Sequence, residues 1–281
     1  MRIAVVGATG VLGRNTIPRL VERGHRVRAL VRQPGQAAWL ARLGIDAVVG
    51  DILEPASLPA VLAGCDAALH LATAVPRPGM PRDFSGNDRI RREGTRHLVA
   101  ACRAAGVARY VQQSIAHIAA DGSTRLLDET APLQPAPTMA STVEMEATVR
   151  DSGLAWSILR GGAFYGPGTG RDEDWRGQAR DGRLKLPGDG EGYISLIHVE
   201  DMADAVALAV ERAPPQTLVA VVDDEPATYR VLLRHIAALE RGPEPASGGP
   251  PFYPSFRVAN GRARSVLGWA PAHASFRSGY V

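Results

Sequence analysis

Lysine is nearly missing from this 281-residue sequence: Lys185 is the only one, and every other basic side chain among the 32 lysines and arginines is an arginine. A reaction that needs a lysine amine must therefore use Lys185 or do without it. Aromatic residues make up only 5%, which disfavours the base-stacking surfaces of nucleic-acid-binding proteins. The net charge is only +3, and the arginines form no basic block, so no nucleic-acid partner is expected.

Cysteines and long apolar runs are also scarce. Cys65 and Cys102 have apolar neighbours and no paired spacing, which argues against a disulfide framework or a zinc site and fits a reducing compartment. No apolar run approaches the length that crosses a membrane. The first predicted strand begins at Arg2, which leaves no room for a signal peptide. We therefore expect a cytoplasmic protein without a membrane partner.

The sequence does contain a regular alternation of strand and helix patterns. Runs typical of buried strands occur at 2–6, 27–31, 46–50, 66–72, 109–114 and 155–160. Helical spacing occurs between them, at 11–24, 36–44, 55–64, 87–106 and 138–153. This alternation predicts an α/β fold: a Rossmann-like, doubly wound parallel sheet with helices on both faces.

The rhythm loosens after residue 162. We expect residues 1–162 to form the dinucleotide-binding domain and residues 163–281 a smaller substrate lobe, interleaved with the first, with helices at 203–213 and 229–242. Two segments rich in proline and glycine, 76–88 and 243–255, are candidate lids over the site or plain surface linkers.

The stretch VVGATGVLG follows the first predicted strand and opens the first predicted helix. Gly7, Gly10 and Gly13 have the spacing of a dinucleotide-binding loop. In such a loop the first glycine makes a tight turn, the second lets the backbone approach a pyrophosphate, and the third lets helix and strand pack closely. The N–H groups at the helix start then face the phosphates. Three further residues of this loop are expected to contact the cofactor: Thr9, Val11 and Leu12.

The segment after the second strand predicts which dinucleotide binds. No Asp or Glu lies between Glu22 and Asp46, so the acidic residue that would bind the ribose 2′-hydroxyl of NAD is missing. Arg32 at the strand's end, with Arg28 within it, suits the 2′-phosphate of NADP. NADP is therefore the expected cofactor, with NAD as the alternative. The residues expected to flank adenine and ribose follow the third and fourth strands: Asp51, Ile52, Leu71, Ala72 and Thr73.

Several segments together resemble the extended short-chain dehydrogenase/reductase family, in its NAD(P)-dependent epimerase/dehydratase branch. They are GATGVLG, GDI, LHLATA, EGTRHLVAA, YVQQSIA, ILRGGAFYGPG, IHVEDMADAV and the closing VANGRARSVLGWAP. They span nearly the whole chain. The resemblance implies the fold and dinucleotide binding, but it says less about the reaction because one fold hosts many chemistries.

The family implies a catalytic Tyr-x-x-x-Lys pair on the helix before the sixth strand, and this sequence lacks it. Counting back from Glu146 places the tyrosine at Thr138 and the lysine at Thr142. No other register supplies the pair, because no tyrosine lies between positions 110 and 165 and no lysine precedes position 185.

Two neighbouring family positions are altered as well. The family's serine falls on Ile115, with Ser114 one residue before it, and the asparagine expected three residues before Gly94 is Arg91. The standard proton relay is therefore absent.

Five side chains are candidate replacements. A serine or threonine hydroxyl is no acid near neutral pH, but it can donate a hydrogen bond, so Ser114, Thr138 and Thr142 are predicted to orient a substrate oxygen or the ribose. His117 titrates in the useful range and follows the fifth strand, which makes it the preferred acid/base. Tyr165, just past the sixth strand, is expected to shape the site more than to react. Each of the five has an alternative role in packing or at the surface.

No metal site is predicted. His198, Glu200 and Asp201 lie close together in the sequence, but no histidine pair has zinc-helix spacing. Asp201 is expected to cap a helix and to interact with its dipole.

Three functions remain open at this stage. The first is an NADP-dependent oxidoreductase, epimerase or dehydratase that acts on a small hydroxylated or carbonyl substrate through a rerouted proton relay. The second is a non-redox cyclase, isomerase or dehydratase that uses the pocket as a template. The third is a cofactor-sensing binding protein. The resemblance also implies a homodimer that pairs through helices of the sheet domain, one of them carrying Thr138.

Overall fold

Seven runs of aliphatic residues form one parallel sheet in the computed structural model, which describes residues 1–76, 80–133, 136–250 and 253–280. The strand order is β12-β7-β5-β4-β1-β2-β3. The strands of this sheet are β1 (Arg2–Val6), β2 (Arg26–Val31), β3 (Asp46–Val49), β4 (Ala67–His70), β5 (Arg109–Ile115), β7 (Ala155–Gly161) and β12 (Thr217–Val221). All six predicted strands are confirmed, and β12 is a seventh that the sequence analysis did not single out.

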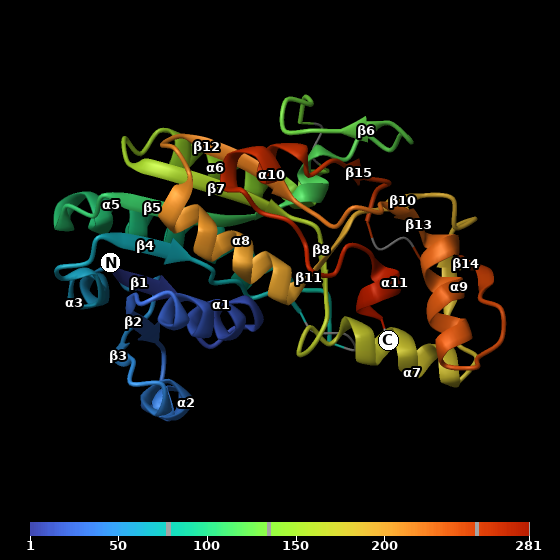
Figure 1. Cartoon of the computed structure of the whole chain (residues 1–281), viewed down its shortest axis with the longest axis horizontal. Coiled ribbons are helices and arrows are strands. Elements are labelled where there is room, and N and C mark those ends of the chain that lie inside the picture. The colour runs from blue at the N-terminus through green and yellow to red at the C-terminus, as the bar shows by residue number, and fades with distance from the viewer. Residues whose placement is uncertain (77–79, 134–135, 251–252, 281) are drawn as a thin grey trace.

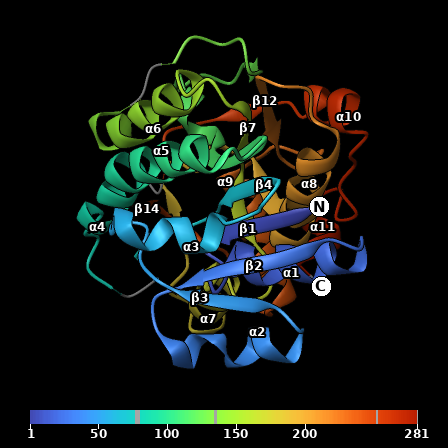
Figure 2. The ribbon, with the colours of Figure 1, turned by 90° about the vertical axis from the view of Figure 1, so that its left-hand side faces the viewer.

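The helices cover both faces of the sheet, as predicted (Figures 1 and 2). They are α1 (Val11–Glu22), α2 (Ala38–Arg42), α3 (Leu58–Leu62), α4 (Ser85–Arg89), α5 (Thr95–Ala105), α6 (Ala140–Arg150), α7 (Arg171–Arg180), α8 (Val199–Arg212), α9 (Tyr229–Leu239), α10 (Gly261–Leu267) and α11 (Phe276–Gly279). Side chains of α1, α2, α8 and α10 pack on one face, and those of α3, α5 and α6 on the other. No helix in the described ranges is both long and apolar enough to traverse a bilayer.

The predicted helix 87–106 is interrupted. Residues Ile90–Gly94 form a π-helical turn between α4 and α5. A π turn inside a helix commonly marks a functional position. Here it carries Arg91 and brings Gly94 against Ile52, where an added Cβ would lie 3.1 Å from the isoleucine side chain.

The order of the strands places the ligand crevice. The chain runs from β1 outward through β2 to β3, then crosses over to β4 on the other side of β1, and both neighbours of β1 are parallel to it. In open α/β sheets the carboxyl ends of the strands at such a reversal form the binding crevice. The glycine loop after β1 and the segment after β4 therefore lie together.

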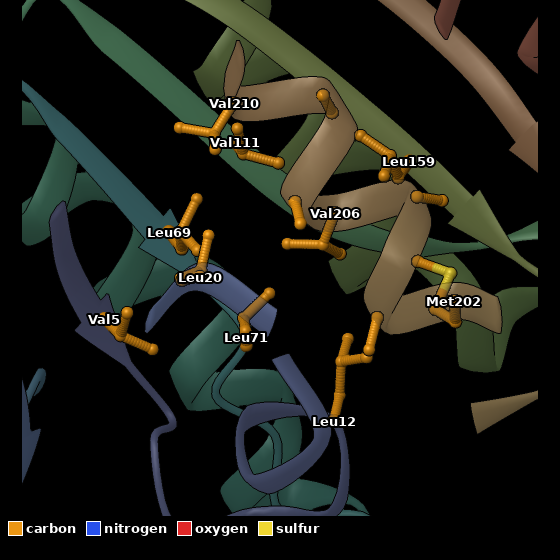
Figure 3. Packing of buried hydrophobic residues seen from close by; sticks show 14 of the residues in the cluster. Val5, Leu12, Leu20, Leu69, Leu71, Val111, Leu159, Met202, Val206 and Val210 are labelled. Atoms are coloured by element: carbon orange, nitrogen blue, oxygen red, sulfur yellow. The ribbon is translucent and has the colours of Figure 1, made fainter. Parts of the chain in front are cut away.

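The core on the α1 side is formed by aliphatic side chains from both halves of the chain. Figure 3 shows Leu12 and Leu20 of the first helix near Met202 and Val206 of α8, with the strands behind them. Because α8 and β12 both lie after residue 162, the later part of the chain completes the first sheet and covers it. The division into 1–162 and 163–281 stays a prediction.

The smaller lobe has its own apolar cluster, at the other end of the molecule (Figure 1). Trp175 of α7, Leu233 of α9 and the rings of Phe256, Phe276 and Tyr280 are buried there. Short strands complete this lobe and its junction with the first: β6 (Leu126–Leu127), β8 (Ala163–Tyr165), β9 (Lys185–Pro187), β10 (Tyr193–Ile194), β11 (Leu196–His198), β13 (Ala227–Thr228), β14 (Ala246–Gly249) and β15 (Arg257–Val258).

A buried ion pair joins α6 to the sheet. Arg160 of β7 donates to both carboxylate oxygens of Glu146, at 2.9 and 2.7 Å, and both side chains are only 3% exposed. Ser114 of β5, the register partner of Arg160, donates to the same carboxylate at 2.7 Å. Burial raises the pKa of Glu146, but the hydrogen bonds and charge of Arg160 and the Ser114 hydroxyl outweigh it and hold the pKa below its usual range. Glu146 therefore has a structural role, as the buried partner of Arg160.

We predict that Arg160→Met lowers the free energy of unfolding by about 3–5 kcal/mol, because it leaves the Glu146 carboxylate buried without its partner. Urea denaturation at pH 7 measures the change. Because the folded pKa of Glu146 is below its unfolded value, the pair's contribution in the wild type is complete above that unfolded value and is lost as the pH falls through the folded pKa.

Two variants serve as controls. Adding Glu146→Gln to Arg160→Met removes the buried charge and should recover part of the loss. Arg150→Met removes a half-exposed partner of the same carboxylate, 3.5 Å away, and should cost less than about 1 kcal/mol. Equal stability of Arg160→Met and the wild type would contradict the prediction.

Candidate active site

The glycine loop has the backbone geometry that a dinucleotide needs. Gly7 has a φ of +93°, and a Cβ there would lie 2.5 Å from the backbone nitrogen of Ala72. A Cβ on Gly13 would lie 2.2 Å from the carbonyl oxygen of Gly7, whereas one on Gly10 would meet only that same oxygen, at 3.3 Å. Gly7 and Gly13 are therefore required by close packing, and Gly10 leaves open the side on which a pyrophosphate would approach.

The remaining loop residues contribute backbone. Leu12 is buried in the core, and Thr9 and Val11 are half-buried at the start of α1. The carbonyl of Thr9 accepts a hydrogen bond from Arg14 Nε at 2.9 Å. Arg14 is exposed, with its guanidinium 6.0 Å from the centre of the Trp39 ring. Arg14 was not among the predicted cofactor-binding residues, although its position directly after Gly13 is a signal that could have indicated it.

The two arginines of the second strand have different environments. Arg28 donates to the carbonyls of Ala60 and Ala63, at 3.3 and 2.8 Å, so it ties β2 to α3. Arg32 is exposed just past the end of β2, and its guanidinium has no hydrogen-bond partner in the described part of the chain. Of the pair, only Arg32 is free to meet a 2′-phosphate.

The predicted adenine side is built around Asp51 and Ile52. The Asp51 carboxylate accepts from the N–H of Leu53 at 2.9 Å, and its own N–H donates to Ser57 at 3.1 Å. Ile52 is buried, and its carbonyl lies 3.2 Å from His97 Nδ1. A tight turn of this kind fixes the end of β3 beside the crevice.

The segment after β4 is held by a residue that the sequence analysis missed. Leu71 is buried and donates to the Val6 carbonyl at 2.8 Å, whereas Ala72 is half-buried and Thr73 exposed. The next residue, Ala74, donates its N–H to Asn87 Oδ1 at 3.0 Å. Asn87 is buried on α4 and links that helix to the cofactor-facing loop.

The residues at the family's tyrosine and lysine positions, Thr138 and Thr142, differ in their exposure to solvent. Thr138 is exposed, in a 3-10 turn at Pro137–Met139 that precedes α6. Thr142 is fully buried on α6, and its hydroxyl has no hydrogen-bond partner among the described residues. Neither side chain is set up as an acid.

The guanidinium of Arg91 contacts α6 next to the position of the missing lysine, at Ser141. Arg91, on the π-helical turn, lies with Nη1 3.4 Å from the hydroxyl of Ser141, the residue before Thr142, and Ser141 donates to Asp88 at 2.6 Å. Burial lowers the pKa of Arg91, with the charge of Asp88 acting against it, but an arginine keeps its proton in proteins. Positive charge is therefore retained beside this part of α6.

Ser114 does not present a free hydroxyl group. It is buried, and its proton is donated to Glu146. The hydroxyl can offer a substrate only its oxygen lone pairs, and its predicted role in orienting a substrate oxygen stays a prediction.

His117 differs from the expectation that it titrates between pH 5 and 8. Its ring lies against Tyr253, with centroids 4.6 Å apart, and against Phe256, at 5.6 Å. Burial, followed by the charges of Arg91 and Arg171, lowers the pKa of His117 to about 3. The imidazole is therefore neutral at physiological pH, and it is no general acid there.

Tyr165 is a packing residue in this structure. It is fully buried, stacks on Tyr280 with centroids 5.1 Å apart, and donates to the Ser275 carbonyl at 3.3 Å. Burial, with nearby carboxylates including Asp223, raises its pKa further above the usual range.

The structure adds a phenol and a guanidinium that the sequence analysis did not select. Arg171 donates through Nη2 to the Tyr253 hydroxyl at 2.9 Å and through Nε to the Phe164 carbonyl at 2.9 Å. Tyr253 lies in the predicted lid 243–255, of which residues 251 and 252 are outside the described residues, as are 77–79 of the other lid. No local pattern marks either side chain, because the two are brought together only by the fold.

His198, Asp201 and His273 form a cluster whose potential ligand atoms lie within 4.8 Å of one another. The Asp201 carboxylate accepts from the N–H groups of Ala272 and His273, at 3.0 and 2.9 Å, and lies 3.1 Å from His273 Nδ1. It therefore ties the C-terminal segment to α8. The expected cap at Asp201 is wrong, because α8 begins earlier, at Val199, and His198 is the capping residue.

Comparison with known sequences supports the interpretation of the glycine loop as part of a dinucleotide-binding site. Residues 7–212 match the NAD(P)H-binding family. A 3-diazoavenalumate denitrifying reductase from a Streptomyces species is 41% identical over 305 aligned positions, which cover 99% of this chain and 99% of that protein. A 2-alkyl-3-oxoalkanoate reductase from Stenotrophomonas maltophilia is 30% identical, over 86% of this chain and 77% of its own length.

Among solved structures, the dTDP-glucose 4,6-dehydratase of Streptomyces venezuelae superposes with a TM-score of 0.86, at 22% identity, over 100% of this chain and 94% of that one. At such low identity the likeness speaks for the fold. The sequence matches, the seven-stranded sheet and the glycine loop agree: the chain belongs to the NAD(P)H-binding family, and it shares its fold with the solved dehydratase.

Proposed function

We propose that this protein is an NADPH-dependent reductase that removes dinitrogen from a small diazo or diazonium compound and leaves hydrogen in its place. The observation that carries the proposal is a cofactor loop with intact geometry in a chain that has threonine at both catalytic family positions, Thr138 in the turn before α6 and Thr142 on α6. The full-length similarity to a denitrifying reductase supports it.

The chemistry explains why a tyrosine–lysine pair can be dispensed with. Reduction of a carbonyl creates an alkoxide, which needs a proton from a nearby acid. NADPH, when bound, supplies a hydride. A diazonium group is displaced by hydride with loss of N2, so one carbon–nitrogen bond breaks, one carbon–hydrogen bond forms, and no proton is consumed. A neutral diazo compound consumes one proton in addition.

The residues around His117 suit a small, flat, unsaturated substrate. The neutral imidazole, the Tyr253 ring and the Phe256 ring lie within 6.0 Å of one another, centroid to centroid. Phe256 is buried and the other two rings are half-buried, which limits the access of water to a reactive diazonium carbon. Arg91 and Arg171 keep the surroundings positive, which favours a substrate that also carries an anionic group.

A second candidate function is reduction of a carbonyl group. The observation that favours it is the Tyr253 phenol, which lies beside Arg171 and could donate a proton to an oxygen. The similarity to a 2-alkyl-3-oxoalkanoate reductase points the same way. The two candidates differ in whether nitrogen is released.

The test is turnover with NADPH that carries deuterium at the transferred position and a diazo carboxylic acid labelled with 15N. We expect release of labelled N2, with one deuterium per product molecule at the carbon that held nitrogen, measured by mass spectrometry. Oxidation of the cofactor with retention of both nitrogens would contradict denitrification.

Arg32 generates a separate prediction about the cofactor. Arg32→Ala should raise the dissociation constant of NADP by about 10–100-fold, since a hydrogen bond to a charged group contributes roughly 1.5–3 kcal/mol. The dissociation constant of NAD, which has no 2′-phosphate, should change by less than about threefold. Isothermal titration calorimetry measures both.

Arg26→Ala is the matched control, because Arg26 is exposed at the opposite end of the same strand. It should leave both constants unchanged. Equal weakening of NADP and NAD by Arg32→Ala would show that Arg32 does not read the 2′-phosphate.

A further inference from the structure

Arg171 is held in one position beside Tyr253. It is the first residue of α7, and its two hydrogen bonds go to the Phe164 carbonyl of β8 and the Tyr253 hydroxyl. Its guanidinium also lies over two rings, 5.1 Å from the centre of Trp175 and 5.6 Å from that of Tyr253. A guanidinium held by two hydrogen bonds and close to two rings loses little further entropy when its neighbour changes charge.

The Tyr253 phenol is the group that can balance the positive charge of Arg171, by losing its proton. Within the described ranges, no carboxylate forms an ion pair with Arg171, and its recorded partners are a carbonyl and the phenol oxygen. The Arg171 charge lowers the pKa of Tyr253 below its usual range; burial acts against this, and the hydrogen bond from Arg171 and the charge of Arg82 add to it.

Tyr253 lies at the edge of the sheet where ligands bind. Its ring packs against His117, which follows the carboxyl end of β5 at Ile115. Arg171 reaches it from the carboxyl side of β8, through Phe164. The carboxyl edge of such a sheet is where substrate meets cofactor.

The Tyr253 proton is free to be donated. Since Arg171 is the donor in their hydrogen bond, the phenol oxygen accepts there, and its own O–H has no acceptor among the residues that the structure describes. The other titratable or charged groups that face Tyr253 are neutral His117 after β5, Arg82 in the segment before α4, and Tyr229 on α9.

We propose that Tyr253 is the proton-donating catalytic residue of this enzyme and that Arg171 is the positioning residue that stabilises its phenolate. The pair stands in for the missing tyrosine and lysine, but from the smaller lobe instead of α6. The choice of diazo compounds as substrates rests on the proposed function; the assignment of the proton donor does not.

A neutral diazo substrate takes up one proton and one hydride and releases N2. The Tyr253 proton passes to the diazo carbon, or to an oxygen conjugated with it, and a bound reduced nicotinamide would supply the hydride for a new bond to the carbon that holds nitrogen. The carbon–nitrogen bond breaks and N2 leaves with the bonding pair. The substrate is reduced and the nicotinamide oxidised by two electrons, and the Tyr253 phenolate regains its proton from water.

The first experiment compares two substrates on the Tyr253→Phe variant, which keeps the ring against His117 and removes only the hydroxyl. With a neutral diazo ketone, which needs a proton, kcat should fall about 10²–10⁴-fold. With an arenediazonium salt, which needs none, kcat should stay within about threefold of the wild type. Equal loss on both substrates, or loss on neither, would overturn the proposal.

The pH profile isolates the contribution of Arg171. With the diazo ketone, kcat should fall as the pH rises through the pKa of Tyr253, because only the protonated phenol donates. In Arg171→Met the pKa rises, so this fall should move to higher pH, and Arg171→Lys should restore part of the original profile. Arg183→Met is the control, because Arg183 is exposed and paired with Asp181; it should leave the profile in place.

Two further readouts separate this proposal from the proposed function. If the wild type releases no nitrogen from either substrate, denitrification fails, and the same Tyr253→Phe comparison is made on a ketone, where loss of kcat supports the proton donor and unchanged kcat overturns it. Near-ultraviolet titration of the NADP-bound protein needs no turnover. One tyrosine should ionise below the usual range in the wild type and be missing in Tyr253→Phe; its absence from the wild type would overturn the proposal.

Discussion

Backbone contact between two strand ends is the constraint on which the site depends. Gly7 touches the peptide that joins Leu71 to Ala72, and Gly13 touches Gly7, at distances that leave no room for a side chain. Because these contacts are between backbone atoms, no rotamer change can relieve a substitution. They set the position of the α1 N-terminus and of the segment after β4, and Asn87 then fixes that segment from α4. The cofactor end of the protein follows from this one packing arrangement.

The positive charge around His117 comes from arginines. In a lysine-based site the cation can lose its proton and its pKa becomes part of the chemistry. An arginine stays charged at every physiological pH, so Arg91 and Arg171 impose a constant positive potential from two sides on His117. Burial, and then these charges, lower the pKa of His117 and keep its imidazole neutral, and the charge of Arg171 lowers the pKa of Tyr253. The Tyr253 phenol and the Arg171 guanidinium thus lie together although they come from distant parts of the chain.

The buried pair of Glu146 and Arg160 holds α6 against the sheet. Its carboxylate fastens the helix to β7 and, through Ser114, to β5. Ser114 is thereby engaged in holding the helix against the sheet. These contacts hold α6 in position without help from the two threonines, of which Thr138 is exposed and Thr142 is buried.

The sequence by itself determined six of the seven strands of the sheet, most of the helices between them and the glycine loop, because each follows from a local pattern of apolar spacing or from the need for glycine at fixed positions. It also determined that Thr138 and Thr142 cannot act as a tyrosine and a lysine. Only the tertiary structure decided that Arg28 is tied to α3 while Arg32 is free, that His117 is neutral, and that Ser114 serves Glu146. The pairing of Arg171 with Tyr253 joins residues 82 positions apart, in segments without regular periodicity. Such a contact depends on how two lobes pack, and no local pattern of residue types encodes it.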